Sequence, residues 1–363
     1  MPKNGQNFLV ESGLQIPPKD NEIEVSVFGR GFGECLVISC GTNEFVVVDS
    51  FKNKETGNPI ALDYMDAIGL PHSAIKQVVL THWHQDHIAG ISDVLNKASS
   101  DAKLVISPVI RKEKFLEYMA IGMAEKSNSV YEFGKVLNFI KFNRDRIIIP
   151  SPNRPVFPYK ESDVEICTLS PNDVDLIEYI DALIVPDEKR KTSYSFPEDN
   201  RLSIVMLVKF GTDGVLLGSD LEDTIKCNSG WKGLVSNYYY INNKPSLIKI
   251  PHHGSSGAHN NDLWNNILID NPLSVLTVFN KGKKLPQDED INRIKSLSKS
   301  LFVVGRHTIK DKNLMRKAKS HLPNINISAV PTSIGLSRFR RIIGENEWHV
   351  ELYGSATEYS VPY

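Results

Sequence analysis

The chain has 363 residues, with 42 lysine and arginine residues against 43 aspartate and glutamate residues and a hydrophobic content of 41%. This composition is typical of ordinary globular proteins and excludes the disordered and fibrous classes, and four cysteines without a CxxC pair exclude a disulfide scaffold. The net charge of −1 gives no global electrostatic reason to bind nucleic acid or a membrane, so an anionic substrate would need a local basic patch or a metal ion.

The amino-terminal residues MPKNGQNFLVESG lack the charged-then-apolar layout of a secretory signal. No apolar run approaches the roughly 18 residues that a membrane span needs. We therefore expect a cytoplasmic protein without a membrane partner.

Strands and helices alternate in the first part of the chain. Short segments rich in β-branched residues predict strands at 23–28, 34–40, 45–49 and 77–80. Apolar residues at helical spacing predict a helix over 59–69. A polar, histidine-dense loop follows the fourth strand directly, and a further helix is predicted to begin near Ser92.

The second part continues the α/β pattern with longer irregular segments. The spacing predicts helix between 109 and 142, whereas 150–159 and 185–200 are rich in proline or charge and predict loops. Further strands are predicted at 202–209, 214–217, 247–250, 338–343 and 348–353, the last two forming a hairpin. Because no linker is visible, we predict one domain over 1–363, with an insertion at about 108–200 and a strand and helix extension at about 290–363.

The segment Thr81-His82-Trp83-His84-Gln85-Asp86-His87 places three histidines and an aspartate within six residues. Neutral imidazole is the commonest metal ligand, so this density indicates a metal site. Two residues apart on an extended segment, His82 and His84 face the same way and would hold one ion. Asp86 and His87 would then bind a second ion about 3.5–4 Å away.

This segment resembles the HxHxDH signature of the metallo-β-lactamase fold. Phe45–Asp49 is similar to that family's strand ending in an aspartate, which implies that Asp49 supports the metal loop. Gly218-Ser219-Asp220 resembles the later aspartate that bridges two metals, although Asp220 could instead cap a helix. The resemblance implies an α/β fold, the αββα metallo-β-lactamase sandwich with a helical insertion, and two divalent metal ions as cofactors, zinc or manganese.

Two further motifs resemble one subgroup of the family, the nuclease-like domains of ComEC-type DNA-uptake proteins and the phosphorylcholine esterases. They are Pro251-His252-His253-Gly254-Ser255 and the glycine-rich segment Gly31–Ile38. If the histidine pair lies on an extended segment, its side chains point to opposite sides. We therefore assign His253 to the metal. His252, paired with Glu222, would protonate a leaving oxygen or merely support the site by hydrogen bonding.

The sequence departs from the family pattern at one metal position. Many members place a histidine between the HxHxDH loop and the bridging aspartate, but none occurs here between His87 and His252. Asn200 or Asp199 is expected at that position, either acting as an oxygen ligand or leaving the place to water. The first ion would then bind loosely, and manganese tolerates oxygen ligands better than zinc does.

The substrate follows from the subgroup resemblance alone, because this fold hosts several hydrolytic reactions. The resemblance implies a phosphodiesterase or nuclease in which Asp86 binds a metal and orients the attacking water. The alternatives are a thioester, lactone or other ester hydrolase, and an effector or regulatory module with a structural metal site. Ser255, Ser256 and His259 are candidate substrate contacts in a turn that would cradle phosphate. The basic clusters Lys281–Lys284 and Arg338–Arg341 predict solvated faces or a nucleic-acid track, and no protein partner is indicated.

Overall fold

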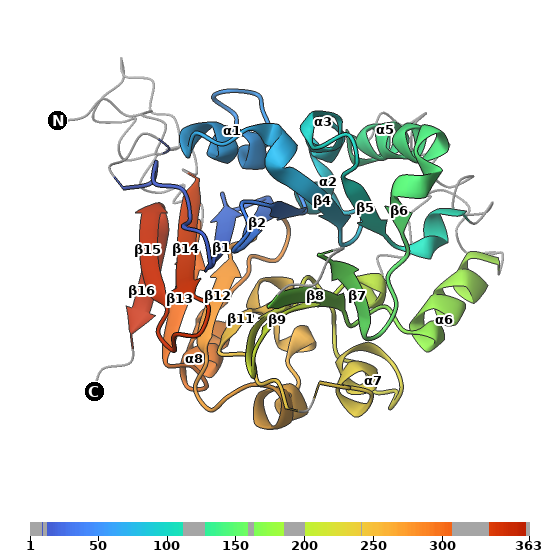
Figure 1. Cartoon of the computed structure of the whole chain (residues 1–363). Coiled ribbons are helices and arrows are strands. Elements are labelled where there is room, and N and C mark those ends of the chain that lie inside the picture. Colours follow the sequence, from blue (N-terminus) through green and yellow to red (C-terminus); the bar gives the residue numbers. More distant parts are fainter. Residues whose placement is uncertain are drawn as a thin grey trace, which may run out of the picture.

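The computed structural model describes residues 9, 13–111, 128–158, 163–184, 200–240, 242–306 and 334–360. Within them, two eight-stranded sheets lie face to face with helices on their outer sides (Figure 1). This arrangement confirms the predicted α/β fold class, a sandwich of two sheets flanked by helices. No helix in the described ranges is both long and apolar enough to cross a membrane.

The first sheet has the strand order β15-β14-β1-β2-β3-β4-β5-β6. Its strands are β1 Glu22–Gly29, β2 Glu34–Cys40, β3 Phe45–Val48, β4 Ile75–Leu80, β5 Lys103–Ile106, β6 Ile147–Ile148, β14 Gly335–Ile342 and β15 His349–Gly354. Strands β3 to β6 run parallel, and β14 pairs antiparallel with β1 over its full length.

The second sheet has the order β16-β13-β12-β11-β10-β9-β8-β7. Its strands are β7 Arg154–Phe157, β8 Val164–Thr168, β9 Met206–Phe210, β10 Asp213–Leu217, β11 Leu247–Lys249, β12 Leu273–Thr277, β13 Ser300–Val304 and β16 Ala356–Ser360. Strands β10 to β13 run parallel. The last strands of the chain thus complete both sheets, β14 and β15 in one and β16 in the other.

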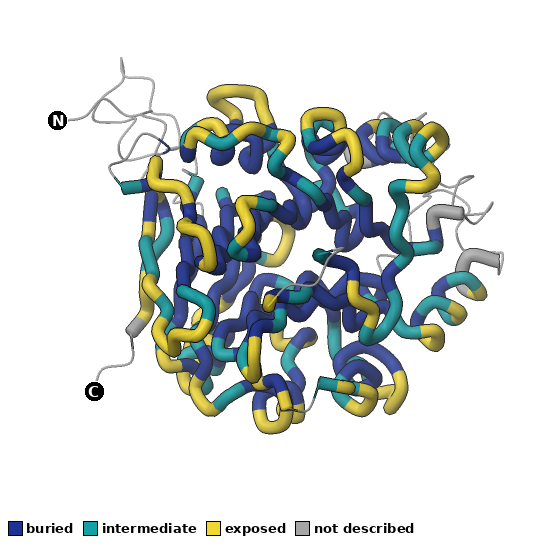
Figure 2. Tube along the Cα trace, in the orientation of Figure 1, coloured by how far each residue is buried: buried dark blue, intermediate teal, exposed yellow. Residues whose placement is uncertain are grey.

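Three apolar layers hold the sandwich together, and Figure 2 shows most of both sheets buried. The middle layer packs the facing sides of the sheets, with Val25 and Ile38 from the first against Met206 and Val208 from the second. The outer layers lie under the helices, as expected for sheets that hide both faces. The helices are α1 Ile60–Ala67, α2 Gln85–Ile88, α3 Ile91–Lys97, α5 Asn128–Phe142, α6 Asp173–Ile184, α7 Gly230–Ser236 and α8 Asp288–Lys295.

Short turns connect the regular elements, several of them beside the candidate site. The 3₁₀ turns are η2 His72–Ala74, η3 Pro108–Arg111, η4 Arg144–Arg146, η5 Asn200–Leu202, η6 Pro251–Gly254 and η7 Ser256–Ala258, and Leu263–Ile267 forms one π-helical turn, η8.

Three local expectations from the sequence are wrong. The proline-rich segment 150–159 contains strand β7, which lies at the edge of its sheet, where proline is tolerated. The strand expected from 202 begins only at Met206, because Asn200–Leu202 form a 3₁₀ turn. Arg338–Arg341 is no solvated face: its arginines are buried and paired with carboxylates of Glu351, Glu24 and Asp213.

Candidate metal centre

The sequence-predicted site residues follow strands whose carboxyl ends meet at one edge of the sandwich. Asp49 follows β3, and the loop Thr81–His87 follows β4, which is parallel to it. Asp220 and the His252-His253 pair follow β10 and β11, also a parallel pair. Parallel strands bring their carboxyl ends together, so residues far apart in the sequence share this edge.

Asp49 is the centre of a buried hydrogen-bond network. Its side chain is 1% exposed and accepts bonds from the Thr81 backbone amide at 2.8 Å and the Thr81 hydroxyl at 2.6 Å. His87 Nδ1 lies 2.7 Å from Asp49 Oδ2, and the Thr81 hydroxyl lies 3.0 Å from His82 Nδ1. Asp49 therefore orients His87 directly and His82 through Thr81, as supporting carboxylates do around metal-binding imidazoles.

The other ring nitrogens of these histidines converge. The Nε2 atoms of His82, His87 and His253 and the Oδ1 atom of Asp220 are buried and make no hydrogen bond among the described residues. Buried polar atoms without partners are costly, so several of them in one place need an explanation. A metal ion supplies one, because it takes lone pairs from nitrogen and oxygen in place of hydrogen bonds.

Four donors are spaced as the ligands of one ion. Asp86 Oδ2 lies 3.6 Å from His87 Nε2 and 3.5 Å from His253 Nε2, while Asp220 Oδ2 lies 3.5 and 3.8 Å from the same nitrogens. Neighbouring ligands of a tetrahedral zinc ion are about 3.4 Å apart, given metal–ligand distances of about 2.0–2.1 Å. This set of four fits a divalent metal ion.

Asp220 also connects this set with the rest of the loop. His82 Nε2 lies 3.8 Å from Asp220 Oδ2, and the ring of His84 lies 4.6 Å from that of His82, centroid to centroid. Ligand atoms of Asp49, His82 and His87 also lie within 4.8 Å of one another. Since Thr81 and His87 already occupy the Asp49 oxygens, a supporting role suits Asp49 better than ligation.

Burial and the neighbouring ionisable groups shift the pKa values of the residues in the cluster. Burial, together with His87 and His84, holds the pKa of His82 well below its usual value. Burial opposes ionisation of Asp220, but His87 and His253 outweigh it and hold its pKa well below the usual range. Burial also opposes protonation of His87, yet Asp220 and Asp86 raise its pKa well above normal. His82 would therefore be neutral and Asp220 charged when an ion binds, and binding to His87 would release a proton.

The backbone of the histidine pair differs from the extended segment that the sequence argument assumed. His252 and His253 have φ values of 46° and 54°, in the left-handed region, because the chain turns sharply after β11. Their side chains still have different surroundings. His253 is 2% exposed and lies in the cluster, whereas His252 is half-buried and lies with Nδ1 3.1 Å from Glu222 Oε1.

Glu222, His252 and Asn200 form a small group beside the cluster. Asn200 donates through Nδ2 to Glu222 Oε1 at 2.9 Å, and the same nitrogen lies 3.5 Å from His252 Nε2. Burial opposes protonation of His252, but Glu222 and Asp220 raise its pKa. His252 lowers the pKa of Glu222 in turn. Asn200 thus contacts the predicted acid, and Asp199 lies outside the described residues.

The expected substrate contacts lie in the turn after the histidine pair. Ser255 accepts from the Gly257 amide at 3.3 Å, and Ser256 is exposed. His259 Nε2 lies 3.0 Å from Asn261 Oδ1, and burial and Arg293 lower the pKa of His259. No contact ties these three residues to the metal cluster among the described residues.

Sequence reasoning missed four residues that surround the cluster: Thr81 and Thr277, which contact histidine Nδ1 atoms, and the buried ion pair Glu34–Lys249. Glu34 is a charged residue at the start of the mainly apolar strand ECLVISC, and Lys249 interrupts the apolar run LIKI; these charges were the available signal. A threonine at the end of a strand gives no comparable signal.

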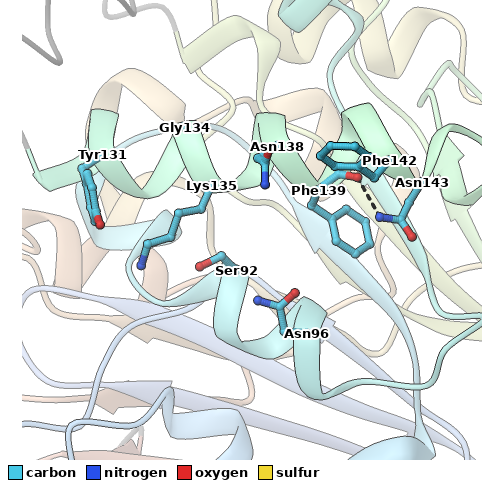
Figure 3. Close-up of a pocket in the computed structure, with 9 residues that line it drawn as sticks. All are labelled: Ser92, Asn96, Tyr131, Gly134, Lys135, Asn138, Phe139, Phe142 and Asn143. Carbon is cyan, nitrogen blue, oxygen red and sulfur yellow. Dashed lines mark hydrogen bonds between the residues drawn. The ribbon is translucent and has the colours of Figure 1, made fainter.

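A groove of about 580 Å³ between α3 and α5 lies apart from this centre (Figure 3). Its lining is amide and aromatic, including Asn96, Asn138, Phe139 and Phe142. It contains none of the candidate ligands, and its single charged side chain, Lys135, pairs with Glu132. The metal cluster therefore remains the candidate functional site.

Parts of this chain are similar to known proteins. The model of the Metallo-beta-lactamase superfamily matches residues 28–139, which include Asp49 and the Thr81–His87 loop. Similar solved structures include the metallo-beta-lactamase SMB-1 with bound 2-mercaptoethanesulfonate, at 12% identity and a TM-score of 0.31, covering 58% of this chain and 68% of that chain. MEM-A1, a subclass B3 metallo-beta-lactamase from a soil metagenome library, has 10% identity and a TM-score of 0.32, covering 88% and 89%. Zinc-bound PqqB from Methylobacterium extorquens has 11% identity and a TM-score of 0.30, covering 60% and 56%.

The matched residues run from β1 into α5 and hold the first half of the candidate centre. The second half consists of Asp220 and His253, which follow the later strands β10 and β11. Their side chains lie about 3.5 Å from those of His87 and Asp86, respectively. Residues 28–139 are thus similar to the Metallo-beta-lactamase superfamily, and the two helix-flanked sheets are consistent with the metallo-beta-lactamase fold.

Proposed function

We propose that the protein is a hydrolase that uses two divalent metal ions, zinc or manganese, and cleaves phosphodiesters as a phosphodiesterase or nuclease. The observation that supports it most is the convergence of three buried imidazole Nε2 atoms on the carboxylates of Asp86 and Asp220. His82, His84 and Asp220 would hold one ion, and Asp86, His87, His253 and Asp220 the other. Bound divalent ions lower the pKa of water and polarise a scissile ester.

The chain's own groups complete the reaction from beside the ions. Asp86, whose pKa is lowered by His87 and His253 against the effect of burial, would orient the attacking water as an ionised carboxylate. His252 would donate a proton to the departing oxygen, with Glu222 holding its ring. Asn200, donating to the same Glu222 oxygen, would fix that carboxylate in place.

A basic side chain at the metal loop favours an anionic substrate. Lys281 Nζ lies 3.4 Å from Oε1 of Gln85, the residue between His84 and Asp86, and 5.0 Å from the centre of the Phe32 ring. Lys281 is exposed, and the neighbouring Lys283 is exposed as well. A phosphodiester carries the negative charge that such a side chain would attract, whereas a lactone does not. The resemblance of the PHHGS motif to phosphodiester-cleaving families agrees with this choice.

The test is hydrolysis of bis(p-nitrophenyl) phosphate by chelator-stripped protein reloaded with zinc or manganese. We expect metal-dependent release of nitrophenol and a raised KM in Lys281→Gln, with Lys244→Gln as the control, an exposed lysine before β11 at the opposite end of that strand. Hydrolysis of a thioester or lactone but no diester would contradict the substrate class. Metal binding without any hydrolysis would favour a structural metal site.

A further inference from the structure

Two series of a carboxylate, a threonine and a histidine lead to the candidate ligands His82 and His253. In the first sheet the series is Asp49, Thr81 and His82. In the second series, the Thr277 hydroxyl donates to Glu34 Oε2 and lies 3.0 Å from His253 Nδ1. Glu34 begins β2 and Thr277 ends β12, so this second series crosses between the sheets.

The direction of each hydrogen bond follows from the carboxylate. An ionised carboxylate accepts hydrogen bonds and never donates them. The Thr277 hydroxyl therefore donates its single hydrogen to Glu34. The hydroxyl then offers a lone pair to His253, whose Nδ1 must carry the hydrogen. The Thr277 backbone carbonyl can only accept a hydrogen bond, lies 3.1 Å from the same nitrogen and favours the same tautomer. In the neutral ring, this tautomer places the lone pair on Nε2, which faces Asp86 and Asp220.

The ion pair between Lys249 and Glu34 keeps this series polarised. Lys249 Nζ lies 2.6 Å from Glu34 Oε1, and both side chains are 1% exposed. Lys249 also donates to the carbonyl of Ser219, the residue before Asp220, at 3.3 Å. A buried ion pair is a poor source of stability because both charges lose their hydration. The pair contacts Thr277, which holds His253, and the carbonyl next to Asp220, and these contacts point instead to a role in the site.

We infer that Glu34, held by Lys249, and Thr277 are positioning residues that fix His253 as the Nδ1–H tautomer and so prepare Nε2 for a metal ion. The inference rests on the proposed metal-dependent function for its purpose. The tautomer itself is a property of this chain without the ion. In Glu34→Gln the amide would donate to Thr277, turn its hydroxyl toward His253 Nδ1 and favour the opposite tautomer.

The experiment combines tautomer spectroscopy with metal competition on the full chain. Long-range 15N–1H correlation spectra of chelator-treated protein report which ring nitrogen of His253 is protonated, with His253→Asn identifying the signal. Zinc and manganese affinities are measured by chelator competition for wild type, Thr277→Val, Thr277→Ser and Glu34→Gln. Ser274→Ala is the matched control, a buried hydroxyl three residues earlier on β12 that bonds to Ser298.

We expect the Nδ1–H tautomer in wild type and in Ser274→Ala. Thr277→Val and Glu34→Gln should bind metal about 10–100-fold more weakly, the usual effect of losing a partner behind a metal-binding histidine. Thr277→Ser should restore binding. A proton on His253 Nε2 in wild type, or unchanged affinity in both Thr277→Val and Glu34→Gln, would overturn the inference. If wild type binds neither metal, the proposed function fails, and the wild-type spectrum decides the inference alone.

Discussion

One peptide bond separates two imidazoles with different surroundings. His253 Nε2 lies among the carboxylates of Asp86 and Asp220, while its Nδ1 is held by Thr277. His252 lies beside Glu222 and keeps partial contact with solvent. The left-handed backbone at both residues makes this divergence possible, and such strained conformations often occur at functional sites.

Replacing each histidine of the pair by alanine should therefore have a different effect. His253→Ala should lower metal content and activity together, because a ligand is lost. His252→Ala should keep the metal while slowing turnover by about 10²–10⁴, the usual contribution of a positioned general acid. In His252→Ala the turnover rate on nitrophenyl phosphodiesters should fall only slightly, because their leaving group needs little protonation. Element analysis and rates on activated and unactivated diesters check this; equal metal loss in both variants would exclude the proposed acid.

At the scale of elements, the sequence predicted the strands that carry the site better than their surroundings. Runs such as FVVV and QVVL are short and rich in β-branched residues, and the sequence placed them within a residue or two. Strand β7 was missed because the prolines in and around it favour a loop, and only its pairing with β8 makes it a strand. The HxHxDH loop was recognisable because its ligands are adjacent in sequence. The contact between Glu34 and Thr277 was not, because it joins residues 243 positions apart.

The carboxyl-terminal strands should prove essential to the core. Phe339 of β14 is fully buried, and its ring packs edge-on against Phe302 of β13 at 5.2 Å, across the two sheets. Phe339→Ala should reduce the free energy of unfolding by about 3–5 kcal/mol, the usual cost of emptying a phenylalanine site in a core. Leu352→Ala, at an exposed position on β15, should cost far less. Urea unfolding followed by fluorescence and circular dichroism measures both.

Coincident transitions with the two probes would place residues 335–360 in the same cooperative unit as the rest of the sandwich. An early, separate transition in Phe339→Ala would instead make the carboxyl-terminal strands an independent unit. That outcome would contradict the single-domain organisation that we propose for 1–363.

At the scale of the whole molecule, the proposed ions would connect the two sheets. His82 and His87 come from the first sheet, and Asp220 and His253 from the second. An ion bound by both sets exists only in the folded chain, so it adds stability by mass action. At a free metal concentration of 100 times Kd, one site adds about 2.7 kcal/mol.

Zinc or manganese should accordingly raise the melting temperature of wild type, and a chelator should reverse the rise. His82→Ala and Asp220→Asn should lose most of this response because each removes a donor from the cluster. His72→Ala is the matched control, since His72 lies in turn η2, pairs with Asp66 and has no contact with the cluster among the described residues. Calorimetry at buffered metal concentrations measures the shift. An equal shift in wild type and both cluster variants would mean that the ions bind elsewhere, because a site that spans the two sheets cannot keep its affinity without these donors.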